Sequence, residues 1–597
     1  MDTFKNIDYL FKKILYNFKN NIPVCLKMLN KKDLVYFDYN LKTFLIKEEI
    51  ISIYKIYLNK YLTEFEVKNK DKYDNSHKLN KIFKEFEKNS KFEVTLNYNK
   101  LKKDLENIEN YILNINLKNN LSRVSQILSL LSLLYIKQFK NNVYTNYFNS
   151  TDIQQIFTTK REIFYSNIAL FNNMKNVDYV INTVCSIFAV SRYELNIFPS
   201  SKGLYFCNFN IVDSISSKVL NLLNNVNLIT SNLISDHNFI LNKFNSLYKD
   251  EDILCVEYIL IVEKDTLFQN LINNDYFKSV YFSTESVIIT AKGYPDYITR
   301  MFIKKLITSI NSNRLEKNLE TPVSILYFGD YDSYGIDIYL NYCYGSINSC
   351  YDNKLLSIDG IKWMGLNSNQ VLDNKDFNNI INCFEEDNKD YYEDEEFKYE
   401  NDVLDNYSEF FENKDISANN NNNIEKVKNK EIFKINSLLI HPALKNIEEF
   451  TKIIDNKVMQ INELENKYNI IMDKNISNQI SDDLLNDIDK CSISKFKISN
   501  DIYNFDNQYY DFKLNLYNDS NLSSQNNLIF LKKNIIMKKY SLFYDLCNLS
   551  SLDCLIKELS LMSSNLKKCE AEVVIQKNIA LFLDIINVNI LNIRYKN

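Results

Sequence analysis

Three carboxylates follow apolar segments that have the length and composition of buried β-strands. Glu263 follows YILIV (258–262), and Asp330 and Asp332 follow VSILYF (323–328) within the sequence GDYDSYG. In an open parallel sheet, ligands bind in the crevice beyond the carboxyl ends of the strands. Carboxylate oxygens gathered there suit a hard cation. The spacing therefore predicts a Mg²⁺ site formed by Glu263, Asp330 and Asp332.

The same acids have a simpler explanation, because Asp commonly caps a helix. A Glu that ends one strand and an Asp-x-Asp that ends a later strand of the same sheet make the metal site more plausible than a lone Asp-x-Asp would. The glycines are consistent with a metal site. The chain has only seven, all between Gly203 and Gly365, in an Asn-, Lys-, Ile-, Tyr- and Phe-rich composition typical of a low-GC coding region. Glycines retained in such a composition indicate backbone positions that cannot accommodate a Cβ. Gly329 and Gly335 flank the two aspartates and would let the chain turn closely around an ion.

A second chemical pattern is the segment Thr-Lys-Arg-Glu-Ile-Phe-Tyr at 159–165. Arg161 and Tyr165 are four residues apart, which places both on one face of a helix. A guanidinium can hold a phosphate bidentately beside the phenol. The phenol, with a pKa near 10, becomes a good nucleophile only where cations favour the phenolate. In a chain with 42 tyrosines, the pair taken alone is better explained as an ordinary surface or core contact.

Bulk properties exclude several classes of protein. The chain of 597 residues has 45% apolar content, enough for roughly two to four domains with real cores. It has no run of eighteen apolar residues and no signal-peptide core, so we expect no membrane segment. Eleven cysteines without a CxxC pair, and histidines only at His77, His237 and His441, argue against zinc or histidine chemistry and for reduced thiols.

The net charge of −5 conceals an uneven distribution. Residues 385–402 contain ten acids and two lysines, a net charge of −8, so the rest of the chain carries +3. A mildly basic body with an acidic insertion permits nucleic-acid binding without requiring it.

The first third of the chain is predicted to be mainly helical. Residues 1–115 form a helical N-terminal region, and residues 116–210 continue with helical patterns at 119–140 and within 152–190. Short β-like pieces, LNIF and LYFCNF, then flank Pro199. Three helices followed by a β-ribbon indicate a winged-helix domain, a fold that often docks on DNA. An ordinary helical domain remains the alternative.

The remainder predicts an α/β domain with insertions. In residues 250–370, three apolar runs alternate with helical patterns, which indicates βαβ units and a parallel sheet. Residues 371–435 have the composition of a disordered acidic and Asn-rich insertion. Residues 436–597 are largely helical, with a possible irregular insertion near 465–525, and their last helices are expected to pack back on the sheet.

Several ordered motifs resemble one known family. The run TKREIFYSNIALFNN is similar to the active-site segment of the family formed by Spo11 and the topoisomerase VI A-type subunits, whose meiotic members cleave DNA. Further blocks match in the same order: VSRYELNIFPSSKGL (190–204), VEKDTLF (262–268), AKGYPDYITRMFIKKL (291–306), GDYDSYGIDI (329–338), YGSINS (344–349), IKWMGLNS (361–368) and ELSLMSSNLKKCEAEVV (558–574). The resemblance covers about 120–370 and 540–597.

The resemblance implies roles for seven residues. Tyr165 matches the catalytic nucleophile, Arg161 the arginine that precedes it, and Lys202 a wing lysine at the DNA backbone. The metal-binding acids of the family's Toprim domain, a Rossmann-like fold, match Glu263, Asp330 and Asp332. Arg300 matches a motif arginine that either contacts DNA or braces the fold.

The chain departs from the family pattern at three positions. Ser333 replaces the proline of Asp-x-Asp-Pro, which is expected to loosen the loop without removing the metal site. Ala291 replaces a glycine before Lys-Gly-Tyr-Pro. Glu162 replaces the commoner aspartate after Arg161, and its longer side chain changes the local spacing.

As a whole, the resemblance implies a nuclear transesterase that breaks double-stranded DNA through a 5′-phosphotyrosyl intermediate and initiates meiotic recombination. It implies Mg²⁺ as cofactor, a homodimer, and a topoisomerase VI B-like ATPase partner. The alternatives are a topoisomerase VI A-type subunit that re-seals its breaks, a degenerate DNA-binding scaffold, and a Toprim nuclease that uses water.

Overall fold

The computed structural model describes residues 3–20, 24–30, 34–67, 111–116, 121–147, 158–213, 219–220, 224–234, 239–242, 256–316, 319, 321–368, 371, 423–476, 524–565, 569–571 and 574. The chain divides into two compact units. The first comprises Met1–Tyr36, Leu45–Ser200 and Ser349–Asp352, and the second comprises Phe37–Phe44, Ser201–Asn348 and Asn353–Asn597.

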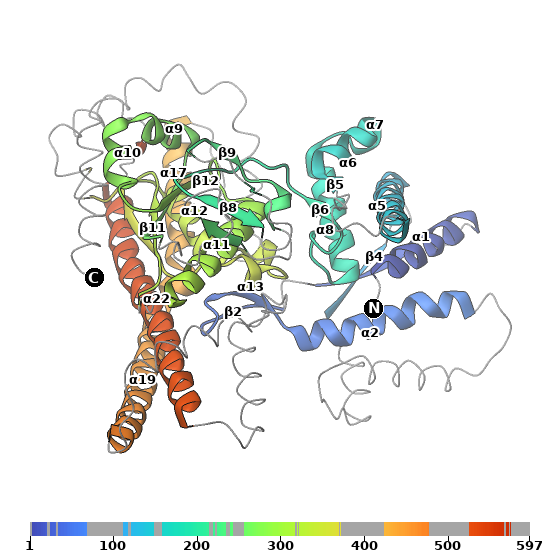
Figure 1. The fold of residues 1–597 in the computed structure, drawn as a ribbon. Helices are drawn as coiled ribbons and strands as arrows, with labels where there is room; N and C mark the ends of the chain where they lie inside the picture. The colour runs from blue at the N-terminus through green and yellow to red at the C-terminus, as the bar shows by residue number, and fades with distance from the viewer. Residues whose placement is uncertain are drawn as a thin grey trace. The chain divides into compact units, whose positions relative to one another are not determined.

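The first unit is built mainly from helices. Its long helices, labelled in Figure 1, are α1 (Thr3–Lys19), α2 (Glu48–Val67), α5 (Leu121–Tyr147) and α8 (Met174–Phe188). On α8, residues 183–188 are all buried, so the C-terminal half of the helix lies within the core. The helix begins after the cap residue Asn173, whose side chain accepts a hydrogen bond from the Asn176 amide.

The prediction of a helical region over residues 1–115 is met only in part. Strand β1 (Cys25–Leu29) pairs antiparallel with β4 (Ile112–Asn116) across more than eighty residues of sequence. Strands β2 (Val35–Asp38) and β3 (Thr43–Ile46) form a second pair. The sequence has no short turn signal that links β1 to β4, and pairing at that separation is not visible as a local pattern.

The segment that holds Tyr165 lies in the first unit between short elements. Strand β5 (Thr158–Thr159) leads into α6 (Lys160–Ser166), α7 (Ile168–Phe171) and α8. Strand β6 (Ile197–Phe198) pairs parallel with β5. The helices predicted within 119–140 and 152–190 are therefore present.

The second unit is organised around a six-stranded sheet of order β14-β13-β11-β12-β7-β9. Strands β11 (Tyr258–Val262), β12 (Ser286–Thr290), β13 (Ser324–Phe328) and β14 (Ile361–Gly365) are parallel. Every residue of β11, β12 and β13 is buried, as expected for strands covered on both faces. The predicted parallel sheet is confirmed, including the strand positions.

Helices connect and cover these strands. They are α9 (Asp265–Asn273), α10 (Asp275–Tyr281), α11 (Tyr297–Glu316), α12 (Ser333–Tyr344) and α13 (Asn353–Leu356), with the 3₁₀ turns η2 (Ser231–Ile234) and η3 (Ile347–Ser349). Each of α9, α11 and α12 follows a parallel strand, which is the βαβ arrangement that the alternating pattern indicates.

The prediction of a β-ribbon around Pro199 is wrong. The piece after Pro199 is β7 (Leu204–Cys207), which joins the sheet of the second unit antiparallel to β12 and carries β9 (Asn227–Leu228) on its other side. The piece before it is β6, in the first unit. Tyr205 and Cys207 are fully buried, so packing against the sheet favours this pairing over a local hairpin. Strand β8 (Asn210–Asp213) pairs antiparallel with β10 (Phe239–Asn242).

Of the last two helices that the sequence predicts to pack back on the sheet, the first lies in α22 and returns to the sheet, whereas nearly all of the second, after Ala571, lies outside the described residues. Helix α19 (Ile447–Ile476) runs beside α22 (Ser524–Asn565) as a long pair. Helix α22 also contacts β14, where the Gly360 amide donates to Asn548 Oδ1 at 3.1 Å. Further along, the Ser368 amide donates to Glu558 Oε2 at 2.8 Å. Side chains of α22 thereby satisfy backbone groups beside the edge strand of the sheet.

The insertion predicted for 371–435 is wrong at its C-terminal end. Helix α17 (Asn423–Leu439) begins inside that range, and α18 (Pro442–Lys445) follows it. The periodic sequence IEKVKNKEIFKINSLL follows the asparagine run directly, and the low-complexity composition obscures where the helix starts. Residues 372–422 and the larger part of the second predicted insertion, 477–523, lie outside the described residues.

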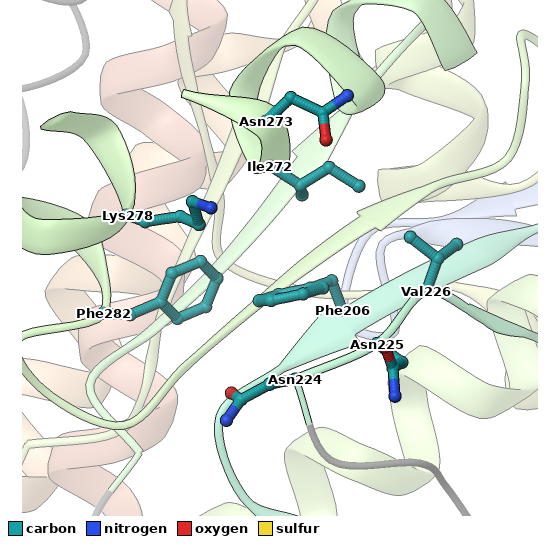
Figure 2. Close-up of a pocket in the computed structure, with 8 residues that line it drawn as sticks. All are labelled: Phe206, Asn224, Asn225, Val226, Ile272, Asn273, Lys278 and Phe282. Carbon is teal, nitrogen blue, oxygen red and sulfur yellow. The ribbon is translucent and has the colours of Figure 1, made fainter. Parts of the chain in front are cut away.

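A pocket of about 450 Å³ opens at the β7 side of the second unit (Figure 2). Its lining consists of Phe206, Asn224, Asn225, Val226, Ile272, Asn273, Lys278 and Phe282. It lies by the C-terminal end of α9, whereas Glu263 precedes the N-terminal end of that helix. The lining has no carboxylate, so this pocket is separate from the predicted metal site. Within the described ranges, no helix is long and apolar enough to cross a membrane.

Candidate active site

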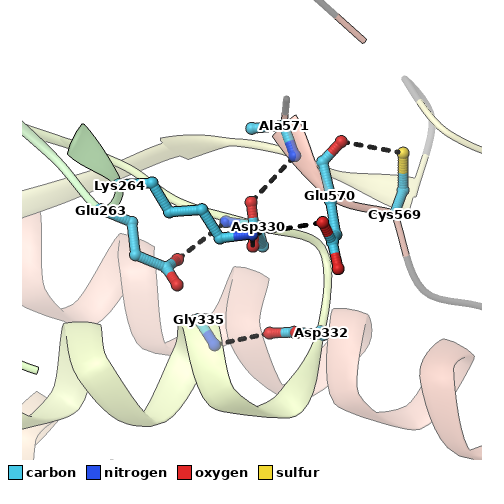
Figure 3. A network of polar contacts seen from close by, with 8 residues as sticks. All are labelled: Glu263, Lys264, Asp330, Asp332, Gly335, Cys569, Glu570 and Ala571. Carbon is cyan, nitrogen blue, oxygen red and sulfur yellow. Dashed lines mark hydrogen bonds and ion pairs between the residues drawn. The ribbon is translucent and has the colours of Figure 1, made fainter. Parts of the chain in front are cut away.

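Glu263 and Asp330 meet at the carboxyl edge of the parallel sheet. Glu263 directly follows β11, and Asp330 follows β13, the strand hydrogen-bonded beside it. The Asp330 amide donates to Glu263 Oε2 at 3.0 Å. Asp330 is 3% exposed and Glu263 is 7% exposed. The structure therefore brings together two of the three predicted metal acids (Figure 3).

Asp332 lies further along the same loop and caps α12. Its Oδ1 accepts a hydrogen bond from the Gly335 amide at 2.6 Å. The capping explanation therefore holds for Asp332.

Two glycines allow this loop to close on Glu263. A Cβ at Gly329 would lie 2.8 Å from Glu263 Oε2, and one at Gly335 would lie 2.6 Å from the Asp330 carbonyl oxygen. At Gly335 the close atom belongs to the backbone, so a side chain cannot be accommodated there. At Gly329 the close atoms belong to side chains, the nearest being Tyr327 Cε1 at 2.7 Å, so Tyr327 and Glu263 would have to shift to admit a Cβ. The prediction that these glycines mark a close turn is confirmed.

The electrostatics of the loop favour a bound cation. Burial, followed by the charges of Asp330 and Asp332, raises the pKa of Glu263 well above its usual range. Burial also raises the pKa of Asp330, while Lys264 opposes that shift. Two buried carboxyl groups that resist ionisation would be relieved by a positive ion between them.

The donor atoms fit a hard divalent cation in chemistry and in charge. In the geometry shown, Asp330 already has two partners: the Lys264 ammonium lies 3.0 Å from Oδ2, and the Ala571 amide donates to Oδ1 at 2.8 Å. Among the described residues, no three carboxylate, thiol or imidazole groups are gathered closely enough to hold an ion. Residues Glu263, Asp330 and Asp332 would hold Mg²⁺ only after some of these contacts rearrange.

Tyr165 lies on α6 in the first unit and is 65% exposed. The helix begins after Thr159, whose hydroxyl accepts a hydrogen bond from the Glu162 amide. Ile163 is buried in the core of this unit and anchors the helix. The phenol therefore projects to solvent from a helix that is held on its opposite side.

The charged side chains around Tyr165 are either exposed, as Arg161 is, or engaged in ion pairs with the neighbouring helices. Arg161, one turn before Tyr165, is exposed. Lys160 and Arg192 both pair with Asp178, and Glu162 pairs with Lys137, so these charges tie α6 to α5 and α8. Arg161 is the cation of this segment that shares the face of Tyr165.

Lys202 does not lie in a wing. It belongs to the second unit, where its ammonium donates to the Tyr294 carbonyl oxygen at 2.8 Å. Burial lowers its pKa. The lysine therefore supports the turn of the Lys-Gly-Tyr-Pro motif, and its contact with DNA stays a prediction.

Arg300 is 5% exposed in α11. Its Nη1 donates to the carbonyl and side-chain oxygens of Asn341, both at 3.3 Å. These bonds join α11 to α12 and favour the bracing role over direct contact with DNA.

Sequence reasoning missed the residues that fix α12 from the side of α17. The Ser333 hydroxyl donates to Glu431 Oε2 at 2.6 Å. Lys434 and Tyr294 both donate to Asp337 Oδ2, at 2.7 and 2.6 Å, and the Lys434–Asp337 pair is almost fully buried. The sequence signal that could have indicated these contacts is the presence of Glu431 and Lys434 among the apolar residues of the helical pattern of α17.

Comparisons with known proteins found matches both for the sheet domain and for the Tyr165 segment. Residues 258–432 match the model of the Toprim domain shared by Spo11 and the A-type subunit of topoisomerase 6, and residues 152–197 match the model named type IIB DNA topoisomerase. The chain therefore carries a Toprim domain of this type, and the resemblance that the motifs indicate is confirmed.

Curated relatives give the same result. The chain is 32% identical over 209 residues to a rice (Oryza sativa subsp. indica) meiotic recombination protein SPO11-1, over 35% of this chain and 48% of the relative. It is 30% identical over 245 residues to human meiotic recombination protein SPO11, over 41% and 52%. It is 26% identical over 220 residues to the A-type subunit of DNA topoisomerase 6 from Arabidopsis thaliana, over 36% and 44%. The chain spans about half the length of these relatives.

Proposed function

We propose that this protein is a topoisomerase-like transesterase that makes double-strand breaks in DNA and initiates meiotic recombination. The observation that carries the proposal is the buried meeting of Glu263 and Asp330 at the carboxyl edge of the sheet, in a chain whose Tyr165 segment and Toprim domain both match the same kind of enzyme. The names of the meiotic relatives support the biological setting and a nuclear location.

In the proposed reaction, the Tyr165 oxygen attacks a backbone phosphorus of duplex DNA. A phosphorus–oxygen bond forms to the tyrosine as the bond to the 3′ oxygen breaks, which gives a 5′-phosphotyrosyl link and a free 3′-hydroxyl. The phenol proton passes to solvent, and the leaving 3′ oxygen takes up a proton. One phosphoester replaces another, so no ATP is consumed.

The surrounding residues have separate tasks. Arg161 offsets charge that develops on the phosphoryl oxygens. Glu263, Asp330 and Asp332 would hold Mg²⁺, which when bound would stabilise negative charge on the leaving oxygen or the adjacent phosphate. Lys202 steadies the turn before α11, and Arg300 braces α11 on α12. These tasks divide between the two units of the chain.

A double-strand break needs two such sites, one for each strand. A two-fold homodimer supplies them when Tyr165 of one chain meets the acids of the other. A B-type ATPase partner is proposed by analogy with the topoisomerase relative.

The decisive experiment examines the DNA ends. Purified protein is incubated with duplex DNA and Mg²⁺, and the products are extracted with phenol before and after protease digestion. We expect cut DNA to enter the phenol phase until protease releases it, with 5′ ends blocked and 3′ ends extendable by a polymerase. Free 5′-phosphates on protein-free DNA would indicate hydrolysis by water and contradict the proposal.

A second candidate is a topoisomerase VI A-type subunit that re-seals its breaks, which the similarity to the Arabidopsis protein favours. Relaxation of supercoiled DNA in the presence of an ATPase partner would identify that activity, because a break-maker leaves linear product.

A further inference from the structure

The loop 329–332, which carries Asp330 and Asp332, and Glu263 beside it are together called the acid loop. A short C-terminal segment, Cys569–Ala571, lies on this acid loop. The Tyr331 amide donates to the Cys569 carbonyl at 2.9 Å, and the Cys569 amide donates back to the Tyr331 carbonyl at 3.0 Å. The Ala571 amide then donates to Asp330 Oδ1 at 2.8 Å. Three hydrogen bonds from the backbone thus fix the segment beside Asp330, more than two hundred residues away in sequence.

This segment brings a fourth carboxylate to the loop through Lys264. The Lys264 ammonium lies 3.0 Å from Asp330 Oδ2 and 3.3 Å from Glu570 Oε2, so one cation bridges the two acids (Figure 3). Asp330 is almost fully buried, whereas Glu570 is about one-third exposed. Lys264 itself is the residue between Glu263 and the first residue of α9.

The bridge has a consequence for cation binding. A divalent ion that binds Asp330 must replace the ammonium, because the two positive charges repel each other at that distance. An ammonium displaced into a partly buried site without a partner would be costly. Glu570 provides that partner, and the ammonium can reach it by a change of side-chain torsions alone.

We propose that Lys264 is an internal counter-ion of the acid centre and that Glu570 is the acceptor that draws it off Asp330 when a divalent cation binds. Glu570 is then a positioning residue, which acts through Lys264 and does not touch the ion. This inference rests on the cation site of the proposed function and adds the residues that set its affinity.

The test is a double-mutant cycle read by direct cation binding. Mn²⁺ binding to the full chain without DNA is measured by electron paramagnetic resonance for the wild type, Lys264→Met, Glu570→Gln and the double variant. Lys264→Met is expected to bind Mn²⁺ about tenfold more tightly, and Glu570→Gln about tenfold more weakly, within the range of couplings between contacting residues. In the Lys264→Met background, Glu570→Gln is expected to change affinity by less than about twofold.

Each alternative gives a different pattern. If Glu570 binds the ion directly, or acts only as a nearby negative charge, Glu570→Gln weakens Mn²⁺ binding equally in both backgrounds, which overturns the inference. An unchanged affinity in Lys264→Met overturns it as well. Glu570→Gln keeps the three backbone hydrogen bonds of the segment, so unfolding of the segment is not expected.

Two control variants complete the design. Lys292→Met removes a similarly exposed lysine that pairs with Asp265 at 2.9 Å, and it is expected to leave Mn²⁺ affinity unchanged. Glu263→Gln removes a proposed ligand and is expected to abolish binding. If Glu263→Gln binds as the wild type does, the cation site of the proposed function fails. If only the Lys264–Glu570 coupling is missing, the further inference alone fails.

Discussion

The Tyr165 segment and the acid loop solve different physical problems. Tyr165 is 65% exposed on a short helix with ordinary backbone geometry. Glu263 and Asp330 are buried, and the glycines beside them leave no room for a Cβ. The exposure of Tyr165 suits the proposed role of a nucleophile, which must reach a large substrate. The proposed ion-binding role of the carboxylates requires them to approach one another, and burial with a tightly constrained backbone allows this.

This difference predicts which substitutions separate chemistry from stability. Tyr165→Phe removes one solvent-exposed oxygen. We expect no covalent protein–DNA product, while the free energy of unfolding changes by less than about 0.5 kcal/mol. Adduct formation is measured by labelled DNA migrating with protein in a denaturing gel, and stability by urea denaturation. Adduct at the wild-type level would remove Tyr165 from the mechanism.

At the acid loop, chemistry and stability should oppose each other. Glu263→Gln is expected to lower adduct formation at least about 100-fold. Folding raises the pKa of Glu263 well above the ordinary value of 4.5. Between these two pKa values the folded state keeps a proton that the unfolded state has lost. The free energy of unfolding therefore falls as the pH rises above about 4.5. The glutamine removes this dependence, so the metal-free variant should melt at a higher temperature than the wild type at pH 7. A lower melting temperature would contradict the electrostatic account.

The buried ion pair between Lys434 of α17 and Asp337 of α12 should matter for stability. Lys434→Met leaves Asp337 with the Tyr294 hydroxyl but without its cation. We expect a loss of about 3–5 kcal/mol, measured by urea denaturation. Lys12→Met, which breaks the exposed Lys12–Asp8 pair, is the matched control and should cost under about 1 kcal/mol. Equal effects would show that α17 does not support α12.

A smaller effect is expected at His441, which lies among the rings of Phe37, Phe44 and Tyr344. Burial lowers its pKa to about 4 from the ordinary 6.5. As the pH falls, the unfolded state therefore binds a proton at His441 before the folded state does. The free energy of unfolding decreases as the pH falls from about 6.5 to about 4, by about 3 kcal/mol in all.

His441→Asn keeps a side-chain acceptor for the Ala443 amide at the start of α18. We expect this variant to have a flatter dependence of unfolding free energy on pH between about 4 and 6.5. The same slope in both proteins would mean that His441 is not the group responsible.

The two regions also differ in how far sequence predicts them. Strands β11, β12 and β13 can be located almost to the residue, because continuous apolar runs between turns are a strong local signal. The position of Glu263 beside Asp330 follows from that topology. Tyr165 has no such signal, since an exposed tyrosine on a helix resembles many others, and only the motif singles it out.

Two of the errors have a common cause, and the third has another. The pairing of β1 with β4, and of β7 with β12, depends on contacts between distant segments that no local pattern encodes. The same holds for Lys264 and Glu570, which are separated by 306 positions and meet only through the fold. Helix α17 is hidden in the sequence because its first residues continue an asparagine-rich stretch.

The central claim is that Tyr165 of one chain and the acids of another form one reaction centre, and mixed chains test it most directly. Tyr165→Phe and Glu263→Gln chains, of different size and each inactive alone, are combined with duplex DNA after mixed dimers have been isolated through two affinity tags. The account predicts one intact site per mixed dimer, seen as a single-strand nick with DNA attached only to the Glu263→Gln chain. Isolated mixed dimers that form no adduct would contradict it.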